Sequence, residues 1–315
     1  MQSKSPSGFA LFLGVFFIFV SVPFLMKRTD HPVEQATQIK TPETVQPKSA
    51  PIEAIYPVER FVKYTFTLHN ESNDLLKDVE FSAVAPVSKT SNQKVNKVDA
   101  TYPFTLQADD LGNQFLNFAF EYIEPFGTKI ITVEAKVAFA NMPNIDDSFG
   151  DLFLGPEKSI ETNDQALIDQ AQKLKAETDW QTAETIFSWT SQYIKYDGFI
   201  AKELGAKQAL VTKRGDCSEY SSLSTALARI NGIPARVMAG FIVESDGNLK
   251  ARDFHNWTEV YIDNKWHILD AQEKYFNQHG AQYLATRIVN GKSSDVLNGS
   301  QRYKVSTEKI KVTME

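Results

Sequence analysis

The chain has 315 residues, and its 42% hydrophobic and 12% aromatic content is enough for a packed core, which excludes a wholly disordered protein. Its formal net charge is -6, so the basic surface typical of nucleic-acid-binding proteins is missing. A single cysteine and five widely spaced histidines exclude a disulfide framework and the common zinc-site spacings.

The first feature along the chain is an apolar run, residues 8–26, that contains no charged side chain. A helix of this length, at about 1.5 Å per residue, comes close to spanning the ~30 Å hydrocarbon core of a bilayer. A cleaved signal peptide is the alternative, but Phe24, Leu25 and Met26 occupy positions where cleavage would need small side chains. The sequence therefore predicts a single transmembrane helix that anchors the protein through residues 1–28.

Residues 29–54 contain prolines among Thr, Gln, Glu and Lys, and almost no large apolar side chains. Such a segment cannot bury enough apolar surface to order itself, so a disordered linker is predicted. Basic residues flank the apolar run on both sides, which leaves its orientation open under the positive-inside rule. We expect the usual arrangement, with the globular part on the exported (periplasmic or extracellular) side, close to the membrane.

Residues 55–142 show the period-two alternation of apolar and polar side chains that is typical of β-strands. The alternation is clear in residues 60–70, 79–85, 116–122 and 131–139, and turn-forming residues separate these runs. This pattern predicts an all-β sandwich. The segment shows no catalytic constellation, so we interpret it as a packing or interaction module.

The pattern changes in residues 143–315, which we expect to form a separate domain, and helical signals follow a loop-like stretch at its start. Thr178 and Gln181 fit the N-cap and N3 positions of a capping box, and apolar residues at helical spacing come after them. A second helix is predicted over residues 218–230, where Leu223 and Leu227 belong to a core-facing stripe. Gly232 after its end supplies the stop signal.

Cys217 falls in the first turn of this second helix, directly after Asp216, a suitable N-cap residue. Free amide groups and the helix dipole stabilise an anion at that position, and the thiolate is the nucleophilic form of cysteine. A lone cysteine is more often a small buried hydrophobic residue. Cys217 lies off the apolar stripe, however, and has no second cysteine with which to pair, so we predict a nucleophile.

A predicted β-hairpin supplies a base and an orienting group. Residues 254–262 and 265–270 are strand-like, and the two residues between them are turn formers. A two-residue loop makes His255 and Asp270 diagonal neighbours on one face of the hairpin. Each could be structural on its own, but together they suit a base for Cys217 and a carboxylate that orients it. His267 has the opposite parity and is predicted to be structural.

Four stretches of the sequence resemble the transglutaminase-like superfamily, namely residues 214–220, 230–240, 255–261 and 266–270. The resemblance covers roughly residues 164–272 and implies that residues 143–315 form a transglutaminase-like catalytic domain with an α+β fold. In that fold a papain-like core carries its nucleophile on a helix packed against an antiparallel sheet. The preceding segment resembles, more weakly, the β-sandwich often found ahead of such domains. Residues 283–289, 302–306 and 310–313 are also strand-like and are expected to close the catalytic sheet.

The resemblance implies that Cys217 is the nucleophile, His255 the general base and then acid, and Asp270 the orienting residue. The backbone amide of Cys217 is one expected oxyanion donor. The resemblance does not decide which side chain would be the second donor, and the candidates are Trp180, Trp189, Tyr196 and Gln208.

The implied activity is thioester-mediated acyl transfer or hydrolysis on amide groups of a protein or peptide substrate. Either water or an amine could accept the acyl group. A non-catalytic, membrane-tethered scaffold or binding module with the same fold is the alternative. The sequence contains no DxDxDG-type calcium loop, so neither a metal nor another cofactor is predicted.

Overall fold

The structure, a computed structural model, describes residues 55–315 except 147–149, 201, 292–296 and 298. The predicted anchor and linker, residues 1–28 and 29–54, lie outside the described residues. Among the helices that the structure does describe, none has both the length and the apolar character needed to cross a bilayer. The described residues all belong to one unit of the chain.

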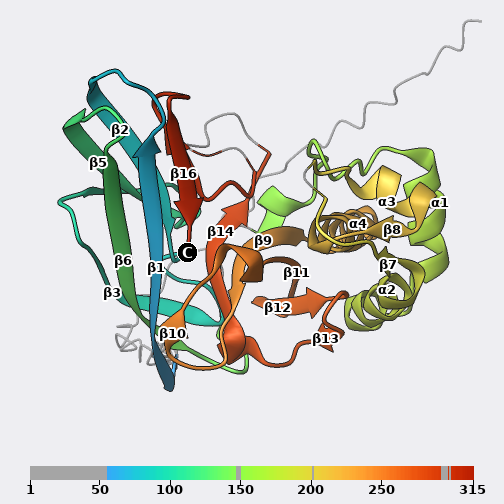
Figure 1. The fold of residues 1–315 in the computed structure, drawn as a ribbon. Helices are drawn as coiled ribbons and strands as arrows, with labels where there is room; N and C mark the ends of the chain where they lie inside the picture. Colours follow the sequence, from blue (N-terminus) through green and yellow to red (C-terminus); the bar gives the residue numbers. More distant parts are fainter. Residues whose placement is uncertain (1–54, 147–149, 201, 292–296, 298) are drawn as a thin grey trace, which may run out of the picture. The chain divides into compact units, whose positions relative to one another are not determined.

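The alternating segments of the first half form two mainly antiparallel sheets that share one apolar core (Figure 1). Tyr64 and Phe66 from one sheet and Phe81 and Phe118 from the other are buried in this core. The predicted two-sheet arrangement is therefore present. Its first strands are β1 (Val58–Asn70), β2 (Leu76–Ala85), β3 (Gln93–Ala100), β4 (Thr105–Ala108), β5 (Gln114–Ile123) and β6 (Thr128–Phe139).

Three strands from later in the chain complete the two sandwich sheets: β10 (Gly247–Asn248), β15 (Tyr303–Val305) and β16 (Ile310–Met314). Strands β10 and β16 pair with β1, and β15 pairs with β2. The expectation that residues 302–306 and 310–313 close the catalytic sheet is therefore wrong. The alternating pattern of these residues is compatible with pairing to any sheet edge that has one buried face. In the structure they pair with the free edges of β1 and β2.

The catalytic sheet is antiparallel and has the strand order β13-β12-β11-β9-β14. One of its faces packs on helices, and the other contacts Val87 and Leu111 from the sandwich segment. Because both faces are covered, its central strands are almost continuously buried. The strands are β9 (Ala235–Ile242), β11 (Phe254–Ile262), β12 (Lys265–Asp270), β13 (Tyr275–Phe276) and β14 (Tyr283–Val289).

Four helices pack beside this sheet: α1 (Gln165–Leu174), α2 (Asp179–Tyr193), α3 (Ala206–Thr212) and α4 (Cys217–Ile230) (Figure 1). The Thr178 side chain accepts a hydrogen bond from the Gln181 amide at 3.2 Å, which confirms the predicted N-cap of α2. Leu223 and Leu227 are fully buried, which confirms the predicted core-facing stripe of α4.

Two buried amide side chains attach β14, the last strand of the catalytic sheet, to the sandwich. Gln93 donates to the Ala285 carbonyl at 2.9 Å and accepts from the Ala285 amide at 2.8 Å. Asn113 donates to the Ile288 carbonyl at 3.0 Å and accepts from the Ile288 amide at 2.6 Å. These bonds satisfy backbone groups that an edge strand leaves unpaired. Strand β14 is therefore held by β9 on one side and by the sandwich on the other.

Candidate active site

The turn that leads into α4 places Cys217 in the first turn of the helix, as predicted. Asp216 is the N-cap and accepts from the Ser218 amide at 2.8 Å, while Glu219 accepts from the Asp216 amide at 3.0 Å. A Cβ at Gly215 would lie 2.2 Å from that of Glu219, so only glycine fits there without a shift. Cys217 is half-buried, so the residue is not sealed inside the core.

The same two carboxylates hold the chain segment that precedes α3. Asp216 accepts from the Ile200 amide at 2.8 Å, and Glu219 accepts from the Leu204 amide at 2.9 Å. Burial raises the pKa of Glu219, although its two backbone hydrogen bonds oppose the change. Sequence reasoning missed this complete capping box. Its signal is the three-residue spacing of Asp216 and Glu219.

The hairpin of β11 and β12 has the predicted register, with Ile262 facing Lys265 and Thr258 facing Leu269. Its two turn residues both have positive φ, as a type I′ turn requires. As a result, His255 Nε2 lies 2.6 Å from Asp270 Oδ2. Both side chains are buried, with exposed fractions of 6% and 1%.

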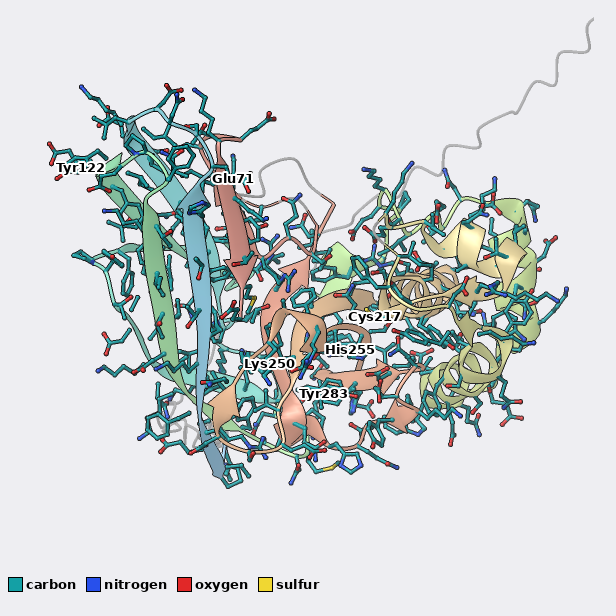
Figure 2. The ribbon with its side chains drawn as sticks, viewed as in Figure 1. Glu71, Tyr122, Cys217, Lys250, His255 and Tyr283 are labelled. Carbon is teal, nitrogen blue, oxygen red and sulfur yellow. The ribbon has the colours of Figure 1, made fainter. Side chains whose placement is uncertain are left out.

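His255 interacts with the side chains of both Asp270 and Cys217. Burial lowers the pKa of His255, but hydrogen bonds and charge interactions with Asp270 and Cys217 outweigh burial and raise it to about 10. The ring therefore carries its proton at neutral pH. Because Nε2 faces Asp270, Nδ1 is the nitrogen left for Cys217. The structure thus brings the three predicted residues together (Figure 2 labels Cys217 and His255).

Asp270 has more partners than the sequence indicated. Its Oδ1 accepts from the backbone amides of Gln272 and Glu273 at 3.1 and 3.0 Å. Its Oδ2 accepts from Tyr283 Oη at 2.8 Å as well as contacting His255. Sequence reasoning missed Tyr283, because no hairpin turn joins its strand, β14, to β12, and only the strand order brings the two residues together.

Side-chain hydrogen bonds fasten α4 to β11 and so set Cys217 against His255. Asn256 Nδ2 donates to Ser218 Oγ at 3.0 Å. Further along the helix, Thr258 Oγ1 donates to the Ser221 carbonyl at 2.9 Å and lies 3.1 Å from Thr225 Oγ1. These contacts alternate along β11 and therefore fix the register of the helix on the strand.

Comparison with known proteins agrees with this geometry. Residues 168–271 match the model of the transglutaminase-like superfamily. They form a transglutaminase-like domain. The chain is 22% identical to human kyphoscoliosis peptidase and 21% identical to the mouse protein over 154 residues. These alignments cover 40% of this chain and 23% of each relative, so the chain spans about a quarter of the relatives' length.

The similarity in fold extends beyond the transglutaminase-like domain. The crystal structure of a candidate cysteine protease from Cytophaga hutchinsonii superposes with a TM-score of 0.54 at 18% identity. The match covers 82% of this chain and 92% of that protein, so it includes sandwich strands as well as the transglutaminase-like domain. At this level of identity the match shows a shared fold.

The four candidate oxyanion donors lie in different places around the transglutaminase-like domain. Trp180 packs against His267 with ring centroids 5.0 Å apart, and Trp189 stacks on Tyr193 at 4.1 Å. Gln208 is exposed on α3. Tyr196 is the one whose backbone pairs with the turn before Cys217, since the short strands β7 (Lys195–Tyr196) and β8 (Arg214–Gly215) are hydrogen-bonded.

His267 has the structural position that its parity predicts. Its two ring nitrogens lie 3.1 Å from the Ile262 carbonyl and 3.1 Å from Asn277 Oδ1. With both nitrogens engaged in this way, the ring supports the end of the hairpin.

Proposed function

We propose that this protein is a membrane-anchored cysteine enzyme that forms a thioester with amide groups of a protein or peptide. The observation that carries the proposal is the joint placement of Cys217, His255 and Asp270. A buried imidazolium paired with a carboxylate is costly to fold, and a scaffold would gain nothing from keeping one beside a half-buried cysteine.

The proposed reaction begins from a Cys217 thiolate that lies beside the already protonated His255 ring. The thiolate attacks the carbonyl carbon of the amide, and the Cys217 backbone amide donates to the developing oxyanion. The carbon–nitrogen bond then breaks, the leaving nitrogen takes a proton from His255, and a thioester remains. Asp270 stays ionised and keeps the ring in position.

Water is the acceptor that we propose for the second step. The half-exposed position of Cys217 leaves a thioester accessible to water, which favours hydrolysis over transfer to an amine. His255 would take a proton from the attacking water, and the carbon–sulfur bond would break to restore the thiol. The name of kyphoscoliosis peptidase, with which this chain shares the transglutaminase-like domain, agrees with a hydrolytic activity.

The test uses the full chain in detergent with glutamine-containing peptides, and it measures ammonia or amine release together with the mass of acid-quenched protein. We expect wild type to show an acyl adduct, and Cys217→Ala and His255→Ala to show none. His69→Ala, at a half-buried position on β1 of the sandwich, is the control and should behave as wild type. An added primary amine should appear in the product only if transfer competes with hydrolysis.

The scaffold alternative makes the opposite prediction for the same experiment. If wild type forms no adduct with any peptide and releases no ammonia or amine, although the variants and wild type are equally folded, the enzymatic proposal fails. Binding of an unmodified protein partner by both wild type and Cys217→Ala would then favour the scaffold.

The membrane anchor is part of the proposal and rests on the apolar run of residues 8–26 and the polar linker that follows it. We expect the full chain to stay with membranes after an alkaline carbonate wash and a variant lacking residues 1–54 to be released. Intact-mass measurement shows whether the segment is cleaved, and protease added to sealed cells or vesicles shows the side of the globular part. Release of the uncleaved full chain by the wash would contradict the anchor.

A further inference from the structure

Tyr283 and His255 share one carboxylate oxygen of Asp270. Tyr283 Oη donates to Asp270 Oδ2 at 2.8 Å, and His255 Nε2 lies 2.6 Å from the same atom. Tyr283 is on β14 and Asp270 on β12, with β11 and β9 between them in the sheet. The phenol therefore reaches across two strands to the carboxylate. Figure 2 labels Tyr283 and His255 in this part of the protein.

Packing leaves the Tyr283 ring little freedom. Its side chain is only 2% exposed and packs edge-on against Trp257, with ring centroids 5.0 Å apart. The Trp257 ring in turn lies nearly parallel to the ring of His255, at 6.4 Å and 16°. Trp257 thus contacts the rings of both Tyr283 and His255, the two residues whose side chains bond to Asp270.

The backbone of β14 is fixed on both sides next to Tyr283. On the sandwich side, Gln93 makes two hydrogen bonds to Ala285. On the β9 side, a Cβ at Gly240 would lie 1.9 Å from the Leu284 carbonyl oxygen, so glycine allows an unusually close approach. The position of the phenol is therefore set by the sandwich and by β9 together, and not by its own segment.

The Tyr283 hydroxyl stays protonated at the pH values at which the site would work. Burial and the neighbouring charge of Asp270 both raise the pKa of Tyr283 above its ordinary value. An Asp270 carboxylate has no proton to donate, so the phenol is the donor in this contact. A donor of this kind withdraws part of the carboxylate's charge from its other partner.

We propose that Tyr283 is a positioning residue: its hydrogen bond to Asp270 weakens the stabilisation that this carboxylate gives to the protonated His255 ring. With the phenol present, Oδ2 is shared between two donors, so the imidazolium is less strongly stabilised and gives up its proton more readily. The consequence of this effect for catalysis rests on the proposed function. The effect on the proton affinity of His255 does not depend on that function.

The test follows the His255 ring directly by NMR titration of histidine labelled with carbon-13, in full-length protein carrying Cys217→Ala. In this background no thiolate contributes and no activity is needed, so failure of this inference is separate from failure of the proposed function. The His255→Gln spectrum assigns the signal. We expect Tyr283→Phe to raise the titration midpoint of His255 by about one pH unit.

Two further variants separate this role from simple packing. Tyr64→Phe removes another buried phenol, which donates to the Val84 carbonyl at 2.7 Å in the sandwich, and it should leave the midpoint unchanged. Replacing Tyr283 with 3,5-difluorotyrosine keeps the ring but strengthens the donor, so the midpoint should fall. This variant also provides the test if Tyr283→Phe does not fold. A midpoint that neither substitution at position 283 moves would overturn the inference.

If the protein turns over peptides as proposed, Tyr283→Phe with Cys217 intact should lower kcat several-fold and change KM little. The alkaline limb of the plot of kcat against pH should move to higher pH, as the NMR midpoint of His255 does. A loss of activity without any movement of that limb would show a packing role instead.

Discussion

Asn256 of β11 donates a hydrogen bond to Ser218 of α4 at 3.0 Å, and these two residues directly follow His255 and Cys217 in the chain. His255 and Cys217 are thus joined through their neighbours as well as through their own contact. A catalytic group must keep its position to a fraction of an ångström, so for the proposed reaction this bond should affect turnover more than it affects stability.

Asn256→Ala removes this link, and we expect it to lower kcat/KM by about ten-fold while the free energy of unfolding falls by only ~1 kcal/mol. Peptide turnover and urea unfolding measure the two effects. Asn117→Ala is a matched control, because Asn117 accepts from Ser82 Oγ at 2.7 Å in the sandwich and should change stability without changing turnover. Equal turnover in wild type and Asn256→Ala would show that the link does not position the site.

Gly215→Ala places a methyl group against the Glu219 side chain and should break the capping box at the start of α4. We expect a loss of ~2 kcal/mol or more in the free energy of unfolding, since overpacking and the lost cap both contribute. Urea unfolding checks this, and the rate of Cys217 alkylation by iodoacetamide should also change. Gly247→Ala has open space around its Cβ and is the control. A Gly215→Ala protein as stable as the control would contradict the argument.

The ion pair of Arg236 and Glu259 is buried inside the catalytic sheet, with two hydrogen bonds of 2.9 and 2.7 Å. Arg236→Met leaves the Glu259 charge without this partner, and we expect a loss of about 3–5 kcal/mol. The double variant Arg236→Met/Glu259→Met removes both charges and should be much closer to wild type. Urea unfolding of the three proteins gives the comparison. If the double variant is less stable than Arg236→Met alone, the desolvation argument is wrong for this ion pair.

The pKa of His255, raised from 6.5 to about 10 in the folded protein, predicts how stability depends on pH. Below pH 6.5 the ring is protonated in both states, and its stabilising effect is fully present. As the pH rises from 6.5 towards 10 the unfolded chain releases the proton first, so this stability is lost, by up to ~1.4 kcal/mol per pH unit.

His255→Gln isolates this contribution from other groups that titrate in the same range. We expect the difference in unfolding free energy between wild type and His255→Gln to shrink as the pH rises from 6.5 to 10. Chemical denaturation at several pH values measures it. A difference that stays constant over this window would mean that the ring is not protonated in the folded protein.

Much of the site was predictable from the sequence because its parts are local. The cap at Asp216, the stripe of Leu223 and Leu227 and the two-residue turn of the hairpin each depend on residues only a few positions apart. Since the hairpin loop fixes the register, even the approach of His255 to Asp270 follows from the order of residues 254–270.

Only the tertiary structure decided which strands meet. Residues 302–306 and 310–313 have the alternation of any edge strand, and the open edges of β1 and β2, not their own sequence, place them in the sandwich. In the same way, Tyr283 contacts Asp270 because Gln93 and Gly240 set the position of β14. A period-two pattern indicates which side of a strand is buried, but it does not indicate which strand will pair with it. Contacts between strands that are distant in the sequence are therefore decided only when the whole sheet packs.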